Sequence, residues 1–463
     1  MIDKQELRTV WHLAWPTMLE ELMNTSVQYV DMAMVGSLGT AATAAVGTTS
    51  TINWLIGGTV SAVGIGFLAY ISRMLGANRP DNAKKAAGQS ILAALCIGIL
   101  FTVITLSISS AVPKWMQAAP EVQPIAARYF RILYTPMLFR TAVIIFGTVL
   151  RAAGDTRSPM RVGLGMNLIN VVLNFLLIYD TRAVSILGLS FSCFGAGLGV
   201  AGAAAASAIS YIMGGISMTI LLFRNKEISP KGYSLRPDTE VLRPCLRVAL
   251  PNMAQRFCTS FGYVIFAGLI NGLGTVATAA HTVANTVESM FYIPAYGMQA
   301  AAATLTGRAI GAQEREKLKA QDRTFVYLEL ALMAFTGFLL FVFAPELVHL
   351  FSEDAEVISL GTLVLRMVAV SEPLYGVSVA TEGMLQGAGL TAKPFLFNVL
   401  SMWAVRNAGT FIATHLLHFG LPGAWACMIA GNMLLVVHFR LYFRKASSML
   451  ISDNSSSVRE VSK

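Results

Sequence analysis

Charged side chains are scarce in this sequence. Asp, Glu, Lys and Arg make up 13% of the 463 residues, whereas hydrophobic residues make up 55%. Soluble domains carry about 25% charged residues, so this composition excludes an ordinary soluble protein and predicts a membrane protein. The net charge of +9 does not indicate nucleic acid binding, because the basic residues lie between apolar runs, where the lipid surface accounts for them.

Cysteine is also scarce, with five residues and no pair at CxxC spacing. This excludes a disulfide framework and a cysteine-based metal site. The sequence has no P-loop, and its G-x-G-x-x-G match, GLGVAG at 197–202, opens an apolar run in which small residues serve helix packing. We therefore expect no nucleotide, no cofactor and no enzyme activity.

A cleavable signal peptide is not expected, because Glu20 and Glu21 interrupt the first apolar run and no A-x-A site follows. That run is predicted to remain as a membrane helix. A scan for stretches of about 20 mainly apolar residues predicts an all-α membrane protein. It gives twelve spans: 10–36, 44–74, 86–112, 122–150, 159–180, 199–223, 246–270, 279–310, 325–348, 357–386, 394–417 and 422–443.

Lys and Arg gather in alternate connections between these spans. Arg73, Arg79, Lys84 and Lys85 lie between the second and third spans, whereas the connection between the first and second has none. Basic connections stay on the cytoplasmic side of a membrane. We therefore expect both termini in the cytoplasm.

The sequence repeats itself. LGTAATAA at 38–45 recurs as LGTVATAA at 273–280, so the two copies are related by an offset of 235 in the numbering. The same offset relates further pairs: Pro16 and Pro251, Gly76 and Gly311, and Gly154 and Gly389. After the fifth span Gly202 best matches Gly423, which leaves the first half about 14 residues longer. Six spans in each half predict two parallel repeats related by an axis along the membrane normal.

The predicted domains follow from this duplication. We expect an N-terminal six-helix lobe at 1–223, a cytoplasmic linker at 224–245 and a C-terminal six-helix lobe at 246–445. The polar, Ser-rich end of the chain at 446–463 is predicted to be a disordered cytoplasmic tail.

The motifs YVDMAMVGSLG, ISRMLGAN and LRAAGDT, with their echoes in the second half, resemble the multidrug and toxic compound extrusion (MATE) family in its bacterial DinF-like branch. The resemblance covers essentially all twelve spans. It implies two lobes around a V-shaped cleft in the bacterial cytoplasmic (inner) membrane. It also implies export of amphipathic organic cations driven by entry of H⁺ or Na⁺. We expect a monomer with a small-molecule substrate and the lipid bilayer as partners.

Polar residues line one face of the first span. Carboxylates facing lipid would cost about 2.5–3.5 kcal/mol each, so this face must line water or protein partners. At 100° per residue the face spans an arc of roughly 140°, and it comprises Glu20, Glu21, Asn24, Thr25, Gln28 and Asp31. The positions related to these by the repeat offset are Gln255, Arg256, Thr259, Ser260, Tyr263 and Phe266. We interpret both faces as walls of a shared cleft.

Asp31 is the first candidate for cation coupling. The resemblance assigns a cation-binding role to the aspartate of VDMAMVG and gives it an asparagine partner that matches Asn174. Some branches carry a second aspartate one turn later, where this sequence has Ile178. That departure favours proton coupling through Asp31, with Glu20 or Glu21 as further candidates. The alternative is a structural Asp31 that only hydrogen-bonds the asparagines.

The predicted substrate cleft combines the two polar faces with acids of the second half. Its members are Gln28, Asn24, Gln255, Arg256, Thr259, Tyr263, Glu288 and Glu382. Glu288 and Glu382 are candidates for coupling or for structural polar contacts, and His281 is expected to be structural. The deep basic residues Arg140, Arg256 and Arg406 indicate either fixed partners of glutamates or an anionic or zwitterionic substrate.

Three functions remain possible on the sequence alone. The first is a secondary antiporter exporting small amphipathic, mainly cationic compounds. The second is a flippase for lipid-linked precursors, which twelve spans and mixed charge disfavour. The third is a receptor or channel, which the parallel duplication and paired polar faces disfavour.

Overall fold

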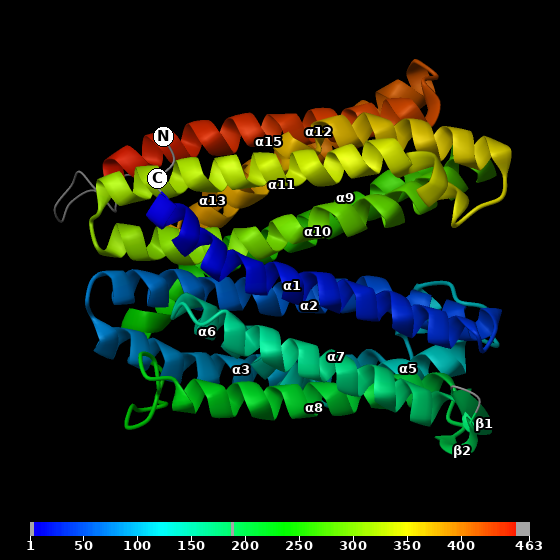
Figure 1. Cartoon of the computed structure of the whole chain (residues 1–463), viewed down its shortest axis with the longest axis horizontal. Helices are drawn as coiled ribbons and strands as arrows, with labels where there is room; N and C mark the ends of the chain where they lie inside the picture. Colours follow the sequence, from blue (N-terminus) through cyan, green and yellow to red (C-terminus); the bar gives the residue numbers. More distant parts are fainter. Residues whose placement is uncertain (1–3, 187–188, 451–463) are drawn as a thin grey trace. The chain divides into compact units, whose positions relative to one another are not determined.

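The computed structural model describes residues 4–186 and 189–450 (Figure 1). The chain forms two compact units. Unit 1 comprises Met1–Glu21, Leu68–Pro80 and Arg243–Lys463, and unit 2 comprises Leu22–Phe67 and Asp81–Leu242. Helices α1 (Lys4–Gly36) and α2 (Thr40–Gly76) therefore each contribute to both units.

The remaining elements of the first half are α3 (Pro80–Ile108), α4 (Val112–Trp115), α5 (Gln123–Tyr134), α6 (Met137–Ala152), α7 (Arg157–Ile178), β1 (Asp180–Ile186), β2 (Leu189–Ala196) and α8 (Val200–Arg224). Those of the second half are α9 (Thr239–Asn271), α10 (Thr275–Gly311), α11 (Arg315–His349), α12 (Ala355–Gly387), α13 (Ala392–Leu400), η1 (Ser401–Ala408), α14 (Gly409–Phe411), η2 (Ile412–Leu416) and α15 (Gly420–Leu450). Helix α15 continues past residue 445, where the tail was predicted to begin, and residues 451–463 lie outside the described chain.

Helices dominate, and most are built to cross a membrane. Within the described residues, eight helices are long and apolar enough to span a bilayer, or nine if the bent pair α5 and α6 counts as one span. Helices α1 and α10 and the run from α13 to η2 coincide with predicted spans but are not among these nine. The protein is thus a multi-pass, mainly α-helical membrane protein.

Two predicted spans are not continuous α-helices. Helices α5 and α6 meet at an angle of 53°, with Pro136 at the start of α6. Proline has no backbone N–H to continue the ladder of an α-helix, which explains why the predicted span at 122–150 breaks here. The span predicted at 394–417 contains two π-helical segments, η1 and η2. The pattern of apolar residues does not distinguish the wider turns of a π-helix from those of an α-helix.

Among the described residues, one short β-hairpin is added to the predicted all-α architecture. Strands β1 and β2 pair antiparallel, from Asp180 opposite Ala196 to Ile186 opposite Leu189. The hairpin lies between α7 and α8, where the first half of the sequence is longer than the second. The alternation of Ser with apolar residues in LSFSCF is typical of a β-strand. The segment is too short to be detected by a scan for stretches of membrane-spanning length.

The duplication is visible in the backbone as well as in the letters. Positive φ angles recur at the offset of 235, in Gly39 and Gly274 (106° and 101°), Asn78 and Gln313 (55° and 60°), and Gly154 and Gly389 (83° and 75°). After the hairpin they recur at the shorter offset, in Gly199 and Gly420 (55° and 59°). The two halves therefore turn in the same way at equivalent positions, even where the residue type has changed.

The first part of α1 packs with helices of the second half. Val10, Ala14 and Met18 belong to a buried cluster with residues of α10, α11, α12 and α15. Thr17 Oγ1 donates to the carbonyl oxygen of Gly297 at 2.8 Å. This packing is why the segment Met1–Glu21 belongs to unit 1.

The connection from α8 to α9 is held against α3. The Gln89 amide donates to the carbonyl oxygen of Arg236 at 2.8 Å and accepts from the backbone N–H of Asp238 at 3.1 Å. Lys85 forms an ion pair with Asp238. The middle of the predicted linker at 224–245 is therefore an ordered connection within unit 2.

Candidate functional site

Asp31 lies half-buried on α1 in unit 2, beside two asparagines of α7. Asn174, fully buried, donates from Nδ2 to Asp31 Oδ1 at 2.5 Å. With its amide nitrogen turned toward α1, Asn170 donates to the two carboxylate oxygens at 2.7 and 3.2 Å and accepts from Ser207 Oγ at 3.1 Å. One carboxylate thus receives several amide donors, which satisfy its oxygens in the protein interior.

The contact between α1 and α7 continues along the helices. Asn167 donates to Asn24 Oδ1 at 3.1 Å. Because α7 carries its asparagines at spacings of three and four, all three lie on the face that meets the polar face of α1. Gln28, predicted for the cleft, is exposed on α1.

Ile178 shows what replaces a second carboxylate near Asp31. It is 2% exposed and packs with Val35, Ala42 and Val200 in an apolar cluster. A carboxylate at this position would meet aliphatic side chains. Asp31 is accordingly the one acid in this contact between α1 and α7, among the described residues.

Glu20 and Glu21 do not belong to the Asp31 cluster. They precede Asp31 by about three turns on the continuous helix α1, which separates them from it by about 15–16 Å at 1.5 Å per residue. Glu20 is 7% exposed and Glu21 is half-buried, and both fall in unit 1. A shared proton with Asp31 would require transfer along the helix.

A second polar cluster surrounds Glu382 in unit 1. Gln255 Nε2 donates to Glu382 Oε1 at 2.7 Å, and Gln299 and Asn398 reach its two oxygens at 3.5 Å. The sequence predicted Glu382 and Gln255 as site residues but not Gln299 or Asn398. Each of these amides is an isolated polar residue within a predicted span, which is the signal that could have identified them.

Glu288 belongs to a third group, near Arg406. Glu288 is 7% exposed on α10, and its charge interacts with those of Arg406 and Glu372. The guanidinium carbon of Arg406 lies 4.5 Å from the ring centroid of Tyr263 and 4.2 Å from that of Phe266. Arg406 is thus held mainly by aromatic faces, which attract cations.

Two buried acids of unit 1 were not predicted. Glu329 is 0% exposed and Glu372 is 1% exposed. Both oxygens of Glu329, and Oε2 of Glu372, have no hydrogen-bond partner among the described side chains. Each lies within a predicted span, so its position in an apolar run was the available signal.

The remaining predicted residues have simpler surroundings. Arg256 and Thr259 are half-buried on α9. Arg140 is 6% exposed and lies over the rings of Tyr134 and Tyr211 at 5.4 and 5.1 Å. His281 packs edge-on against Phe266 and Trp425. Among the described residues, no group of three or more His, Cys, Asp or Glu could hold a metal ion.

Comparison with known families gives two matches on this chain. The family model described as MatE matches residues 16–176 and again residues 251–412. The starts of the two matches differ by 235, the offset already seen in the sequence and in the backbone.

Curated relatives cover nearly the whole chain. A probable multidrug resistance protein NorM of Thermotoga maritima is 26% identical over 419 residues, which is 90% of this chain and 88% of that protein. An uncharacterized transporter YisQ of Bacillus subtilis is 26% identical over 91% of this chain and 90% of its own.

Solved structures match the fold closely. A MOP superfamily transporter from Pyrococcus furiosus, described as having a binding pocket of reverse polarity that suggests a different function, has a TM-score of 0.89 and 25% identity over 98% of this chain and 100% of its own. A MATE structure in complex with MaL6 has a TM-score of 0.89 and 24% identity over 97% of this chain and 98% of its own.

Proposed function

Since this chain belongs to the MatE family and is therefore a membrane transporter and not an enzyme, we propose that it is a secondary active antiporter that exports small amphipathic organic compounds in exchange for H⁺ or Na⁺. The observation that carries the proposal is the half-buried carboxylate of Asp31, held by the amides of Asn174 and Asn170. An ionisable group inside a membrane protein is costly to bury, so its presence marks either an ion or substrate pathway or a paired structural contact.

The proposed architecture has twelve transmembrane helices in two parallel six-helix repeats, with a V-shaped cleft that opens to each side in turn. The recurrent backbone turns and the two family matches support the repeats. We assign the chain to the DinF-like branch on its VDMAMVG and LRAAGDT motifs.

H⁺ is the favoured coupling ion. With the apolar Ile178 one turn beyond Asn174, Asp31 is the one charged oxygen donor in this contact among the described residues, which favours a proton over Na⁺. Coupling to a proton requires only one carboxylate that alternately binds and releases the proton. Glu20 and Glu21 are proposed as further protonation sites on α1, reached after Asp31.

The proposed substrates are amphipathic cations, as the family resemblance implies, and the name of one relative, a multidrug export protein MepA of Staphylococcus saprophyticus, supports the export of drugs. The proposed cleft surface comprises Asn24, Gln28, Gln255, Arg256, Thr259, Tyr263, Glu288 and Glu382. We further propose a monomer in the bacterial cytoplasmic membrane with both termini in the cytoplasm.

Export of an anionic or zwitterionic metabolite is a second candidate function. It is favoured by Arg140 and Arg406, which lie against aromatic rings and form no ion pair within 4 Å among the described residues. Arg406 also interacts with the charge of Glu288, whereas the groups that act on Arg140 are tyrosines, so Arg140 is the better candidate for attracting a carboxylate or phosphate. The flippase alternative has no such observation in its favour.

The test is transport by the purified protein in sealed vesicles. Efflux of a fluorescent organic cation and of a dicarboxylate is followed under an imposed proton gradient and, separately, an imposed sodium gradient. Cation movement driven by the proton gradient alone is the expected result. Dicarboxylate movement would establish the second candidate, and no movement of either under any gradient would contradict antiport.

A further inference from the structure

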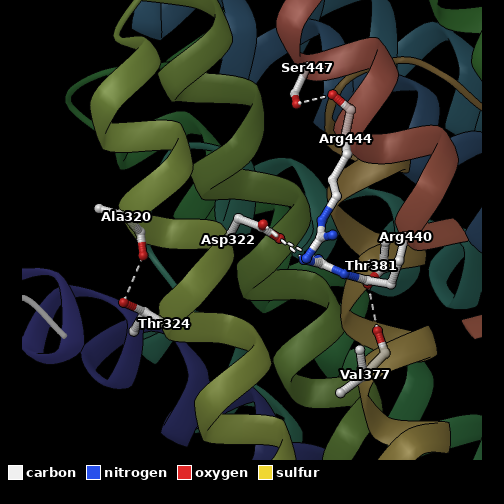
Figure 2. Close-up of polar contacts among 8 residues, drawn as sticks. All are labelled: Ala320, Asp322, Thr324, Val377, Thr381, Arg440, Arg444 and Ser447. Atoms are coloured by element: carbon white, nitrogen blue, oxygen red, sulfur yellow. Dashed lines mark hydrogen bonds and ion pairs between the residues drawn. The ribbon is translucent and has the colours of Figure 1, made fainter. Parts of the chain in front are cut away.

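A groove of about 660 Å³ runs between the first half of α11 and the last turns of α15 in unit 1. Its lining is basic at one end and apolar at the other. Figure 2 shows the centre of the basic end, where Arg440 and Arg444 of α15 reach toward Asp322 of α11. None of these residues belongs to the polar clusters around Asp31, Glu382 or Glu288.

Positive charge exceeds negative charge in this groove. Its lining includes five cations, Arg315, Lys319, Arg323, Arg440 and Arg444, and one acid, Asp322. Arg440 is paired with Asp322, with a second contact from Nη2 to Oδ2 at 3.0 Å, and Lys319 is paired with Glu316 at 2.8 Å. The other three arginines form no ion pair within 4 Å among the described residues, so the lining carries a net positive charge.

The ion pair between Arg440 and Asp322 is also fixed in position. Asp322 and Arg440 are only 16% and 15% exposed as side chains. Their two parallel contacts hold the guanidinium of Arg440 in one orientation, as in other bidentate pairs of arginine with carboxylate. Arg444, one turn further along α15, extends toward this pair (Figure 2).

The apolar end begins directly after the basic one. On α11, Arg323 is followed by Val326, Tyr327 and Leu330, and the last of these lies roughly 10 Å further along the helix axis. Tyr327 and Leu330 are 54% and 37% exposed. Leu318 and Phe443, both 2% exposed, belong to the lining and to the buried core cluster of unit 1.

We propose that this groove binds an anionic phospholipid, with the phosphate between Arg323 and Arg444 and an acyl chain along Val326, Tyr327 and Leu330. Basic pockets between membrane helices bind acidic lipid headgroups, and a tyrosine suits the boundary between headgroup and hydrocarbon. A free phosphate would use the arginines and leave the apolar end uncovered. A zwitterionic lipid would gain no net Coulomb energy from the charge excess.

A second groove, with fewer charged residues in its lining, provides a comparison for the role of charge. It lies between α7 and α8 in unit 2, with a volume of about 310 Å³, and Arg161 is the one cation in its lining. Its apolar lining is similar in kind, with Val162, Met166 and Leu221. The proposal therefore predicts selectivity for acidic lipids at the α11–α15 groove and none at the α7–α8 groove.

The experiment measures lipid binding to the full chain in detergent by native mass spectrometry. Phosphatidylglycerol, phosphatidylcholine and inorganic phosphate are titrated separately. The wild type is expected to bind phosphatidylglycerol more tightly than phosphatidylcholine. Because each basic residue near an anionic lipid contributes about fivefold in affinity, Arg323→Gln with Arg444→Gln should weaken phosphatidylglycerol binding roughly 25-fold.

The matched control is Arg243→Gln with Arg247→Gln, which removes the same charge from two exposed positions of α9 outside the groove. It should change the affinity less than twofold. Arg444→Gln alone, expected to lose about fivefold, keeps the test available if the double variant does not fold. Equal losses in both double variants, equal affinity for the two lipids, or displacement of phosphatidylglycerol by inorganic phosphate would each overturn the proposal.

Discussion

Gly76 and Gly311, which the repeat offset relates, pack reciprocally on each other's helices. A Cβ atom on Gly76 would lie 2.1 Å from the carbonyl oxygen of Arg308, and one on Gly311 would lie 2.1 Å from that of Arg73. Arg73 and Arg308 are themselves related by the same offset. The contact between the ends of α2 and α10 in unit 1 is therefore the same in both directions, as expected for halves related by a twofold axis.

This contact predicts that neither glycine tolerates a side chain. Gly76→Ala and Gly311→Ala would each force two backbones apart, and overpacking of this kind costs about 1–3 kcal/mol. We expect both variants to lower the midpoint of thermal unfolding in detergent. Gly268→Ala is the control, because a Cβ atom there meets nothing within 4 Å. If all three variants unfolded at the same temperature, the reciprocal packing would be wrong.

Asp31→Asn tests the proposed coupling site. The amide keeps the size of the side chain but cannot exchange a proton, so gradient-driven efflux from vesicles should be lost while the protein remains folded in the membrane. The matched control is Glu353→Gln, an exposed acid with no role in the site, which should retain wild-type efflux. Wild-type efflux by Asp31→Asn, with the same pH dependence, would reduce Asp31 to a structural residue.

The ion pair that fastens the α8–α9 connection predicts a pH-dependent effect. The hydrogen bond from Lys85 holds the pKa of Asp238 below its ordinary value of 3.8. A carboxyl group with a depressed pKa stabilises the folded state above its ordinary pKa, and this stabilisation disappears as the pH falls through the folded pKa. Asp238→Asn should therefore speed hydrogen exchange in residues 225–238 at pH 7, and the difference from wild type should vanish well below pH 3.8.

Glu240→Gln is the control for this experiment, since Glu240 is an exposed acid just beyond Asp238 in the chain. It should leave exchange in residues 225–238 unchanged at both pH values. Faster exchange in Asp238→Asn that persisted unchanged in acid would assign the effect to something other than the Asp238 charge.

Orientation is tested by cysteine labelling in a background without the native cysteines. Thr40→Cys and Thr275→Cys are exposed, repeat-related positions at the starts of α2 and α10. The basic connections predict that both react with a membrane-impermeant maleimide applied to intact cells, whereas Arg79→Cys reacts only after permeabilisation. Labelling of Arg79→Cys in intact cells would invert the predicted topology.

The helices and the duplication could be predicted because each leaves a direct mark on the sequence. Apolar runs of membrane length mark the helices, and the offset between Gly39 and Gly274 marks the repeat. The hairpin and the bend at Pro136 were not predicted, because a scan for long apolar stretches detects neither a short strand nor a bend within a stretch. The π-helical turns depend on packing against neighbouring helices, as in the bond from Asn407 to the carbonyl oxygen of Gly262, which no local pattern encodes.

The candidate site was only partly accessible from the sequence. The contact of Asp31 with Asn174 followed from a family resemblance, and the spacing of the α7 asparagines agrees with it. Glu329 and Glu372 were overlooked because a long apolar span tolerates a single acid without losing its signal. Which acids share a cluster depends on tertiary packing, so Glu20 and Asp31, on one predicted face, lie far apart along α1.

The repeat-related position of Asp31 is Phe266, whose ring lies against Arg406, and that of Asn174 is Gly409. Two copies produced by duplication begin identical, so an acid and amide present in one half and absent from the other were gained or lost after the copies were joined. The backbone turns have meanwhile stayed alike in both halves. The fold is therefore older than the asymmetry of its chemistry, and the two halves have diverged at these positions while keeping a common scaffold.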